Sequence, residues 1–331
     1  MAGEQSHFGG VRLHVVSGKG GTGKTTVASA LALALAGGGR KVLLVEVEAR
    51  QGLARVFDTG PLPYDEVKIA SAPAKGEVFA LAIDPEAALL DYLDMFYNLG
   101  RAGSALKKMG AVDFATTVAP GLRDVLLTGK TCEAVRRVTG GKSTYDAVVM
   151  DAPPTGRITQ FLNVNSEVAG LARVGPIKNQ ADSVMRVIRS AHTAVHLVTL
   201  LEEMPVQETI DGVLDLRDAS LPVGGVIVNQ TQPPELPEQA LSRARIGKLT
   251  HSGVTAGLIA AGIDPNMAKK AAPGLTLEAQ RHAERVELQK QERSRLSTLA
   301  LPTAELPYLS DGVDLGGLYE LAAGLKDQGF A

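Results

Sequence analysis

The chain has 331 residues, of which 45% are hydrophobic and 21% are charged, a composition typical of ordinary globular proteins in water. Its formal net charge of −2 gives no electrostatic basis for binding nucleic acid, and its single cysteine, Cys132, excludes an internal disulfide and any multi-cysteine metal site. The first residues show no signal-peptide pattern, and no apolar run has the length of a membrane span. We therefore expect a cytosolic protein that is peripheral to a membrane only through a partner.

The first informative stretch lies between a predicted strand at 11–16 and a predicted helix at 27–36. The strand, VRLHVV, is apolar and branched, and the helix, VASALALALA, is rich in alanine and leucine. Between them, SGKGGTGKTT at 17–26 matches the pattern G-x-x-x-x-G-K-[ST] from Gly18 to Thr25. This order predicts a phosphate site, because backbone N–H groups of the loop and the helix N-terminus can face phosphate oxygens. The alternative is a glycine-rich turn that binds no ligand.

The side chains of this loop have distinct expected roles. Lys24 is expected to reach the β- and γ-phosphates, and the Thr25 hydroxyl to ligate Mg²⁺. Lys19 is a second cation at a position that the general pattern leaves open, and it repels Lys24 unless an anion separates the two charges. The expected nucleotide-binding set in the loop is Gly18, Lys19, Gly20, Gly21, Thr22, Gly23, Lys24, Thr25 and Thr26.

Buried strands and helices alternate along the rest of the chain. Consecutive apolar residues predict strands that are covered on both faces, as in a parallel sheet. We expect an α/β fold with a doubly wound, mostly parallel sheet in a single domain over 1–331, with helical insertions at about 85–140, 165–192 and 232–297. The first two insertions are expected to cap the carboxyl edge of the sheet, and 59–76 is predicted to be a surface connection. The expected further strands are 41–48, 77–84, 145–151, 193–200, 223–230 and 297–303.

Polar residues at strand ends are the remaining site candidates. Asp151 follows a buried strand and precedes APPTG, where it can hold Mg²⁺ directly or through water; the alternative is a carboxylate that only caps a turn. Asn229 ends another strand, and its amide can read an adenine edge with one donor and one acceptor. The chain has no N-K-x-D guanine motif, which favours ATP over GTP. We expect no zinc, since His192 and His196 fall on a strand, where residues four apart are too distant to share an ion. We assign no function to Glu46.

Several of these segments resemble one family. The loop KGGTGKTT, which includes Lys19, is similar to the deviant P-loop of the SIMIBI-class dimeric ATPases. DAPPTG at 151–156 resembles the DTAPTGH motif of the arsenite-pump and guided-entry (tail-anchored protein targeting) branch of that class. VNQ around Asn229 and ELPYLSDG around Pro307 are similar to segments of the same branch. The resemblance covers most of the chain.

The resemblance implies an Mg²⁺-dependent ATPase with a P-loop NTPase fold that closes as a dimer around ATP. In such dimers the extra lysine, here Lys19, reaches across the interface to the nucleotide of the other subunit. Asn229 and Pro307 are expected to contact adenine. The partner subunit is either a second copy of the chain, giving a homodimer, or a paralogous ATPase, giving a heterodimer.

The resemblance also points to the residue that activates the attacking water. The family has a D-P-A-H-x-L stretch after its second strand, and Glu48 falls at the position of the aspartate. This carboxylate is one methylene longer, Ala49 replaces the proline, and Ala152 and Arg157 replace the threonine and histidine of DTAPTGH. The alternative is that Glu48 only ends a strand. The expected catalytic residues are Lys19, Lys24, Glu48 and Asp151.

The functional expectation is an ATP cycle coupled to binding or handing over a hydrophobic protein client or a membrane partner. The helix at 86–99 is either an ordinary buried helix or one wall of a groove for such a client. The arsenite-binding cysteines and the zinc-linking C-x-x-C of the family are absent. Two alternatives stay open, namely the energising ATPase subunit of an anion efflux system and a nucleotide-dependent scaffold with low turnover.

Overall fold

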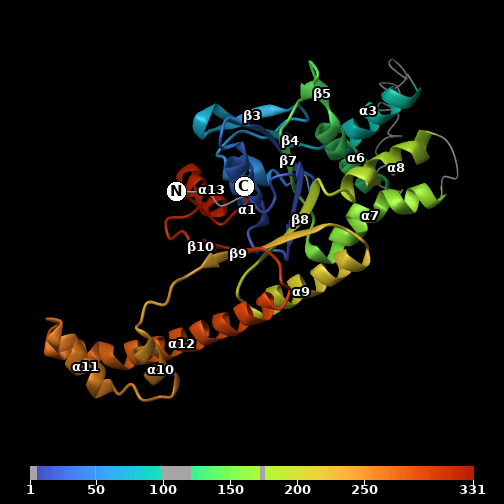
Figure 1. Cartoon of the computed structure of the whole chain (residues 1–331). Helices are drawn as coiled ribbons and strands as arrows, with labels where there is room; N and C mark the ends of the chain where they lie inside the picture. Colours follow the sequence, from blue (N-terminus) through green and yellow to red (C-terminus); the bar gives the residue numbers. More distant parts are fainter. Residues whose placement is uncertain (1–5, 49, 98–120, 172–175) are drawn as a thin grey trace. The chain divides into compact units, whose positions relative to one another are not determined.

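The computed structural model describes residues 6–48, 50–97, 121–171 and 176–331, which form two compact units (Figure 1). The smaller, which we call the helical unit, comprises Leu201–Val206 and Gln232–Ala300. The larger, which we call the sheet unit, holds the rest of the described chain.

The sheet unit is built around eight strands in the order β10-β9-β8-β1-β7-β2-β4-β3 (Figure 1). All neighbouring pairs are parallel except β3 and β4, which are antiparallel. The predicted doubly wound, mostly parallel sheet is therefore confirmed. The strands are β1 Leu13–Gly18, β2 Lys41–Glu46, β3 Val67–Ala72, β4 Gly76–Ala82, β7 Ala147–Asp151, β8 Thr193–Thr199, β9 Val223–Thr231 and β10 Thr303–Pro307, with a small separate hairpin of β5 Val138–Thr139 and β6 Lys142–Ser143.

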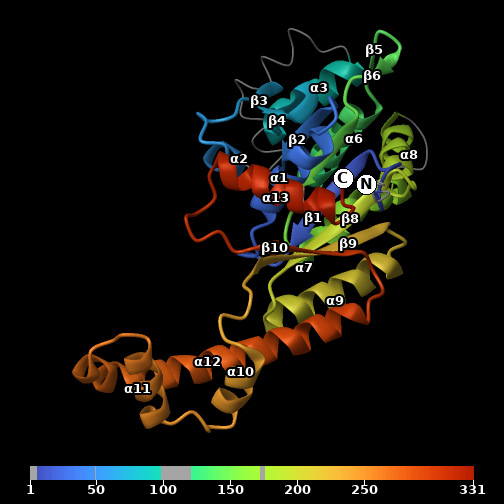
Figure 2. The ribbon, with the colours of Figure 1, turned by 60° about the vertical axis from the view of Figure 1, so that its left-hand side comes forward.

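Helices cover both faces of the central strands (Figures 1 and 2). Alternate residues of β2, such as Val42 and Leu44, share one buried cluster with the apolar side chains of α1 Lys24–Ala36 and α13 Leu315–Asp327. The residues between them, such as Leu43, are equally buried, and α6 and α7 pack against β7 and β1. The other helices of this unit are α2 Gly52–Val56, α3 Pro85–Tyr97, α6 Leu122–Arg136, α7 Thr155–Leu171, α8 Pro176–Ile188 and most of α9 Glu203–Asp218, with a short 3₁₀ turn at Pro73–Lys75.

The helical unit contains the first residues of α9 together with α10 Glu238–Arg245, α11 His251–Ala260 and α12 Pro265–Ser297, and α10 and α11 pack against α12. The long helix starts where its sequence dictates: Asp264 caps it by accepting from the backbone N–H groups of Asn266 at 2.9 Å and Met267 at 3.1 Å, and Pro265 takes the first helical position. No helix in the described part of either unit is long and apolar enough to cross a bilayer.

Strand register brings the candidate residues to one edge of the sheet. Asp151 is the Cα partner of Val16 on β1 and of Glu46 on β2. Because these three strands are parallel and neighbours, their carboxyl ends meet where the loop that starts at Gly18 begins.

Two predicted segments are wrong, one a surface connection and the other a strand. The segment 59–76 is not only a surface connection, because Val67–Ala72 forms β3; this edge strand is half exposed and antiparallel, so its sequence lacks a continuous apolar run. The last strand is not at 297–303 but at Thr303–Pro307. Leu299 instead lies in the turn that follows α12, where it is buried and its N–H donates to the carbonyl oxygen of Leu296 at 3.0 Å.

Candidate functional site

The phosphate loop has the geometry that its glycines require. It leaves β1 at Gly18 and enters α1 after Gly23, which adopts the left-handed conformation with φ of 85°. A Cβ atom at Gly23 would lie 2.3 Å from Nδ2 of Asn229, and one at Gly18 would lie 2.2 Å from the carbonyl oxygen of Val198. Any other residue would therefore force the loop apart. The first turn of α1 carries no acidic side chain, so its N–H groups and partial positive charge are left for an anion.

Thr25 and Asp151 meet at the start of α1, as a Mg²⁺ site requires. The Thr25 hydroxyl donates to Oδ2 of Asp151 at 2.6 Å, and Asp151 is 8% exposed. Burial raises the pKa of Asp151 to about 6, although the Thr25 hydrogen bond and the charge of Lys24 act in the opposite direction. The raised pKa shows that the nearby positive charge does not compensate for the burial of this carboxylate. The carboxylate and the Thr25 hydroxyl together offer hard oxygen donors, which suit Mg²⁺.

Lys24 and Glu48 line the same cavity, which has a volume of about 310 Å³. Burial lowers the pKa of Lys24, and the carboxylates of Asp151 and Glu48 oppose that shift. Glu48 is 22% exposed in its side chain, and its Oε1 lies 3.7 Å from Nη2 of Arg50. The cavity therefore brings together a lysine, a magnesium-type pair of oxygens and a second carboxylate that water can reach. Gly20, Gly21, Gly23 and Thr26 also line it.

Glu46, to which the sequence assigned no function, has a clear structural role. Its carboxylate is buried and accepts from the backbone N–H groups of Gly52 and Leu53, both at 3.1 Å. These are the first two residues of α2, so Glu46 caps that short helix and fixes the loop that carries Glu48. The signal was present in the sequence as a carboxylate at a strand end just before a helix.

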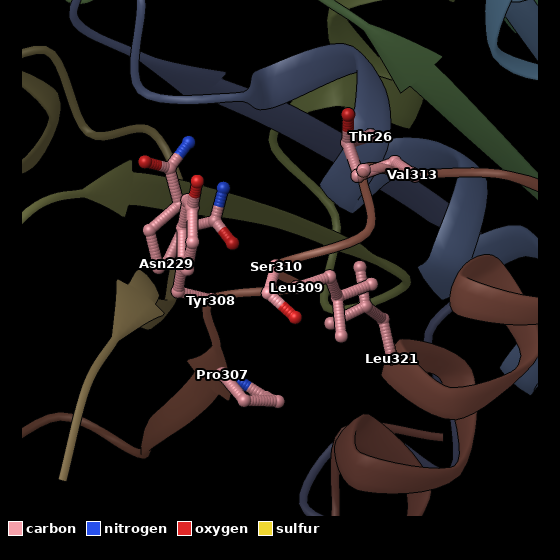
Figure 3. A pocket seen from close by; sticks show the side chains of 10 residues that line it. Thr26, Asn229, Pro307, Tyr308, Leu309, Ser310, Val313 and Leu321 are labelled. Atoms are coloured by element: carbon pink, nitrogen blue, oxygen red, sulfur yellow. The ribbon is translucent and has the colours of Figure 1, made fainter.

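A second cavity, of about 210 Å³, lies where adenine was expected (Figure 3). Asn229 and Pro307, the two residues expected to contact adenine, both line it. The Asn229 side chain also contacts the phosphate loop, because its Nδ2 donates to the carbonyl oxygen of Thr22 at 2.9 Å. One of the two amide N–H groups of Asn229 is thus used by the loop, which leaves the other N–H and the carbonyl oxygen for a base edge. The segment ELPYLSDG at 305–312, which the sequence singled out around Pro307, also supplies Tyr308, Leu309 and Ser310 to the lining, whereas Val313 and Leu321 were not singled out.

Lys19 does not point at Lys24 but at an anion of its own. Its Nζ lies 2.6 Å from Oε1 of Glu208, which is on α9. The backbone carbonyl of Lys19 accepts from the Thr22 hydroxyl at 2.9 Å, which closes the loop turn. The sequence predicted repulsion between Lys19 and Lys24 unless an anion separates them, but it did not predict a partner for Lys19 within its own chain; Glu208 lies 189 residues further along.

A third cavity, of about 160 Å³, shares Glu48 and Arg50 in its lining with the 310 Å³ cavity beside the phosphate loop, which we call the phosphate cavity. Arg157, which stands where the family has histidine, lines it and lies 3.5 Å from Asp124 at the start of α6. Burial raises the pKa of Asp124. Arg123 completes a set of three guanidinium groups around this cavity.

Comparison with known proteins places this site in a family. A model of the family described as anion-transporting ATPase matches residues 11–191. The chain is 55% identical to ATPase BagA of Mycobacterium tuberculosis over 98% of its own length and 95% of the relative. It is 27% identical to ATPase GET3 of Kluyveromyces lactis over 65% of its length and 70% of that protein, and 26% identical to ATPase GET3 of Rhodotorula glutinis over 66% and 70%. The chain therefore belongs to the anion-transporting ATPase family and is an ATPase.

Proposed function

We propose that the chain is a Mg²⁺-dependent ATPase that works as a nucleotide-gated dimer and couples its cycle to a hydrophobic protein client or a membrane partner. The observation that carries the first half is the convergence of Lys24, Thr25, Asp151 and Glu48 on one cavity at the end of the glycine-rich loop. ATP closes two subunits over their phosphate loops, and hydrolysis lets them open.

Each residue of the candidate site has its own role in this proposal. The loop N–H groups and Lys24 bind the β- and γ-phosphates, and Thr25 with Asp151 would hold Mg²⁺, which supplies further neutralisation of phosphate charge. Glu48 orients the attacking water and accepts its proton. Lys19 of the partner meets the charge that develops in the transition state, as an arginine finger does.

The client half of the proposal is supported by the helical unit. α11 is apolar in sequence and has no buried residue, and large apolar side chains elsewhere in this unit are exposed to water. Flexible or exposed apolar side chains of this kind suit a nonpolar client surface. The expected groove wall at 86–99 gives no support, because the side chains from Tyr92 onward lie outside the described part of the chain. In the described part of the helical unit, the exposed large apolar residues are Met204, Ile246, Ile259, Ile263, Met267, Leu275, Leu277 and Leu288.

The experiment that tests nucleotide gating is sedimentation of the Glu48→Gln variant, which binds ATP but hydrolyses it slowly, with ATP or ADP. We expect a dimer with ATP and Mg²⁺ and a larger monomer fraction with ADP, and no ATP effect in Lys24→Ala. If the partner is a paralogue, both chains are mixed. A sedimentation profile that is the same with ATP, with ADP and without nucleotide would contradict gating.

A second candidate function, the energising subunit of an anion efflux system, is favoured by the third cavity. Arg50, Arg123 and Arg157 line it together with Glu48 and Asp124. Arg50 and Arg157 lie near these two carboxylates, so it is the excess of one guanidinium charge that suits an oxyanion. Stimulation of ATP turnover by a small oxyanion, lost in Arg123→Gln, would favour this function. A nucleotide-dependent scaffold with low turnover would instead show closure without appreciable hydrolysis.

A further inference from the structure

Glu208 contacts the loop residue whose proposed work is done in another subunit. The 2.6 Å contact between Lys19 Nζ and Glu208 Oε1 is a charge-assisted hydrogen bond within one chain, and the two side chains are only 31% and 36% exposed. To reach a partner's nucleotide, the Lys19 ammonium has to leave this carboxylate. The pair therefore favours the arrangement in which Lys19 serves no active site.

The Glu208 side chain is fixed from a second side. Its other carboxylate oxygen, Oε2, accepts from the Thr155 hydroxyl at 3.4 Å. Thr155 is 5% exposed and is the first residue of α7, four residues after Asp151. α9 lies close to Thr155 for a further turn, since a Cβ atom at Gly212 would lie 3.4 Å from Thr155 Cγ2. One carboxylate thus contacts both the phosphate loop and the start of α7, the helix that follows Asp151.

In the chain, Glu208 lies next to the boundary between the two units. α9 begins at Glu203, and its residues up to Val206 belong to the helical unit, whereas those from Gln207 onward belong to the sheet unit. Glu208 is therefore the second residue of the sheet unit on a helix that the two units share. A movement of Lys19 or of Thr155 would alter one of the two contacts that Glu208 makes.

We propose that Glu208 is a positioning residue that retains Lys19 in its own subunit until the partner subunit and its nucleotide compete for the ammonium. Hydrolysis then occurs only in the closed dimer, and the Lys19–Glu208 ion pair of each subunit breaks during closure. This inference rests on the proposed function, because it presupposes that Lys19 acts across the interface. A ligand or contact shifts such an equilibrium only by its different affinity for the two states, and here Glu208 binds Lys19 in the open state alone.

The test is ATP turnover per subunit as a function of subunit concentration, for wild type, Glu208→Gln, Glu208→Asp and Asp215→Asn. The last variant removes an exposed carboxylate from the same helix and controls for net charge. Glu208→Gln keeps the shape and removes the charge that holds Lys19. In this variant we expect a fall in the subunit concentration at which turnover is half-maximal. The fall should be about two- to fivefold for each subunit, which corresponds to the free energy of exposed ion pairs, and the KM for ATP should be unchanged. Glu208→Asp should lie between Glu208→Gln and wild type, and Asp215→Asn should match wild type.

The outcomes separate this inference from the function on which it rests. A Glu208→Gln curve that coincides with wild type, or one with lower maximal turnover, would overturn the proposed role of Glu208 while leaving the dimer intact. Wild-type turnover that does not depend on concentration, with Lys19→Ala equally active, would instead overturn the dimeric function. Thermal unfolding of each variant checks folding, and Glu208→Asp, which keeps the charge, tests the inference even if Glu208→Gln is unstable.

Discussion

The two units of this chain bury very different side chains. In the sheet unit, every central strand is buried on both faces, and α1 buries ten consecutive residues from Val27 to Ala36. In α10–α12 the buried residues are mostly alanine, and α11 buries none. The polar groups differ as well. Those of the nucleotide site are held by named partners such as Thr25 with Asp151, whereas the charged residues of α12 are mainly exposed.

The difference indicates where stability and where adaptability lie. A packed core holds the phosphate loop and its carboxylates to within the small tolerances that catalysis needs. A unit with few large buried side chains gains little from its own core, and its exposed isoleucines and leucines are left to contact something else. Function that needs precise geometry is therefore expected in the sheet unit, and contacts with clients in the helical unit.

The largest contrast is expected between two lysines. Lys24→Ala removes the cation that lines the phosphate cavity and should abolish hydrolysis and weaken ATP binding, at a cost of about 2–4 kcal/mol. Lys269→Ala removes an exposed charge from α12 and should leave both unchanged. Steady-state turnover and ATP titration measure the two effects. Wild-type turnover in Lys24→Ala would contradict the assignment of the site.

The next effect concerns two carboxylates that meet in the same cavity. Glu48→Gln should slow turnover by a factor of about 10² while ATP still binds, because the water loses its base. Asp151→Asn should instead change the Mg²⁺ dependence, because the ion loses its negatively charged ligand while the Thr25 hydroxyl keeps a neutral hydrogen-bond partner. Turnover over a range of Mg²⁺ concentrations separates the variants. Equal Mg²⁺ dependence in all three proteins would mean that Asp151 does not hold the ion.

These residues also show how far the sequence could lead. The glycine-rich loop, Asp151 and the buried strands follow local patterns, since a parallel strand needs an apolar run and a phosphate loop needs its glycines. Glu208 was out of reach, because its partner lies far away in the chain and nothing near it in sequence marks an ion pair. Edge strand β3 was missed for a related reason: it is half exposed, so its pattern depends on the neighbour it pairs with.

A third comparison concerns stability. Leu31 is fully buried in α1, and Leu31→Ala should lower the free energy of unfolding by about 2–5 kcal/mol. Ile259 is 41% exposed on α11, and Ile259→Ala should change it by less than about 0.5 kcal/mol. Urea unfolding of both variants gives the two values. A large loss in Ile259→Ala would mean that α11 packs against a partner in solution.

A further effect is a pH dependence that belongs to the sheet unit. His14 and His196 are fully buried, with His14 Nδ1 and His196 Nε2 3.1 Å apart, and burial lowers the pKa of His14 to about 4 and that of His196 well below its usual value. The unfolded chain therefore binds protons that the folded protein does not, and stability should fall as pH drops from about 6.5 towards 4. Asp151, with its raised pKa, acts in the opposite sense below about pH 6.

The matched variant is His14→Gln, which removes one of the two buried imidazoles and leaves Asp151 in place. Each unit of depressed pKa corresponds to about 1.4 kcal/mol, so the fall in stability between pH 6.5 and 4.5 should be smaller in the variant than in wild type. Urea unfolding at several pH values measures the slope. Equal slopes for the two proteins would contradict the neutral state of His14.

The proposed dimer requires Lys19 to act on the nucleotide of the other subunit, and mixing two inactive variants tests this requirement. Lys19→Ala should bind ATP almost normally but hydrolyse it poorly, and Lys24→Ala should be inactive; in the mixed dimer one site keeps Lys24 from the first chain and receives Lys19 from the second. We expect activity to return in part when the two inactive variants are mixed, or when they are placed on the two chains of a paralogous pair. No recovery despite demonstrated subunit exchange would show that Lys19 works within its own chain.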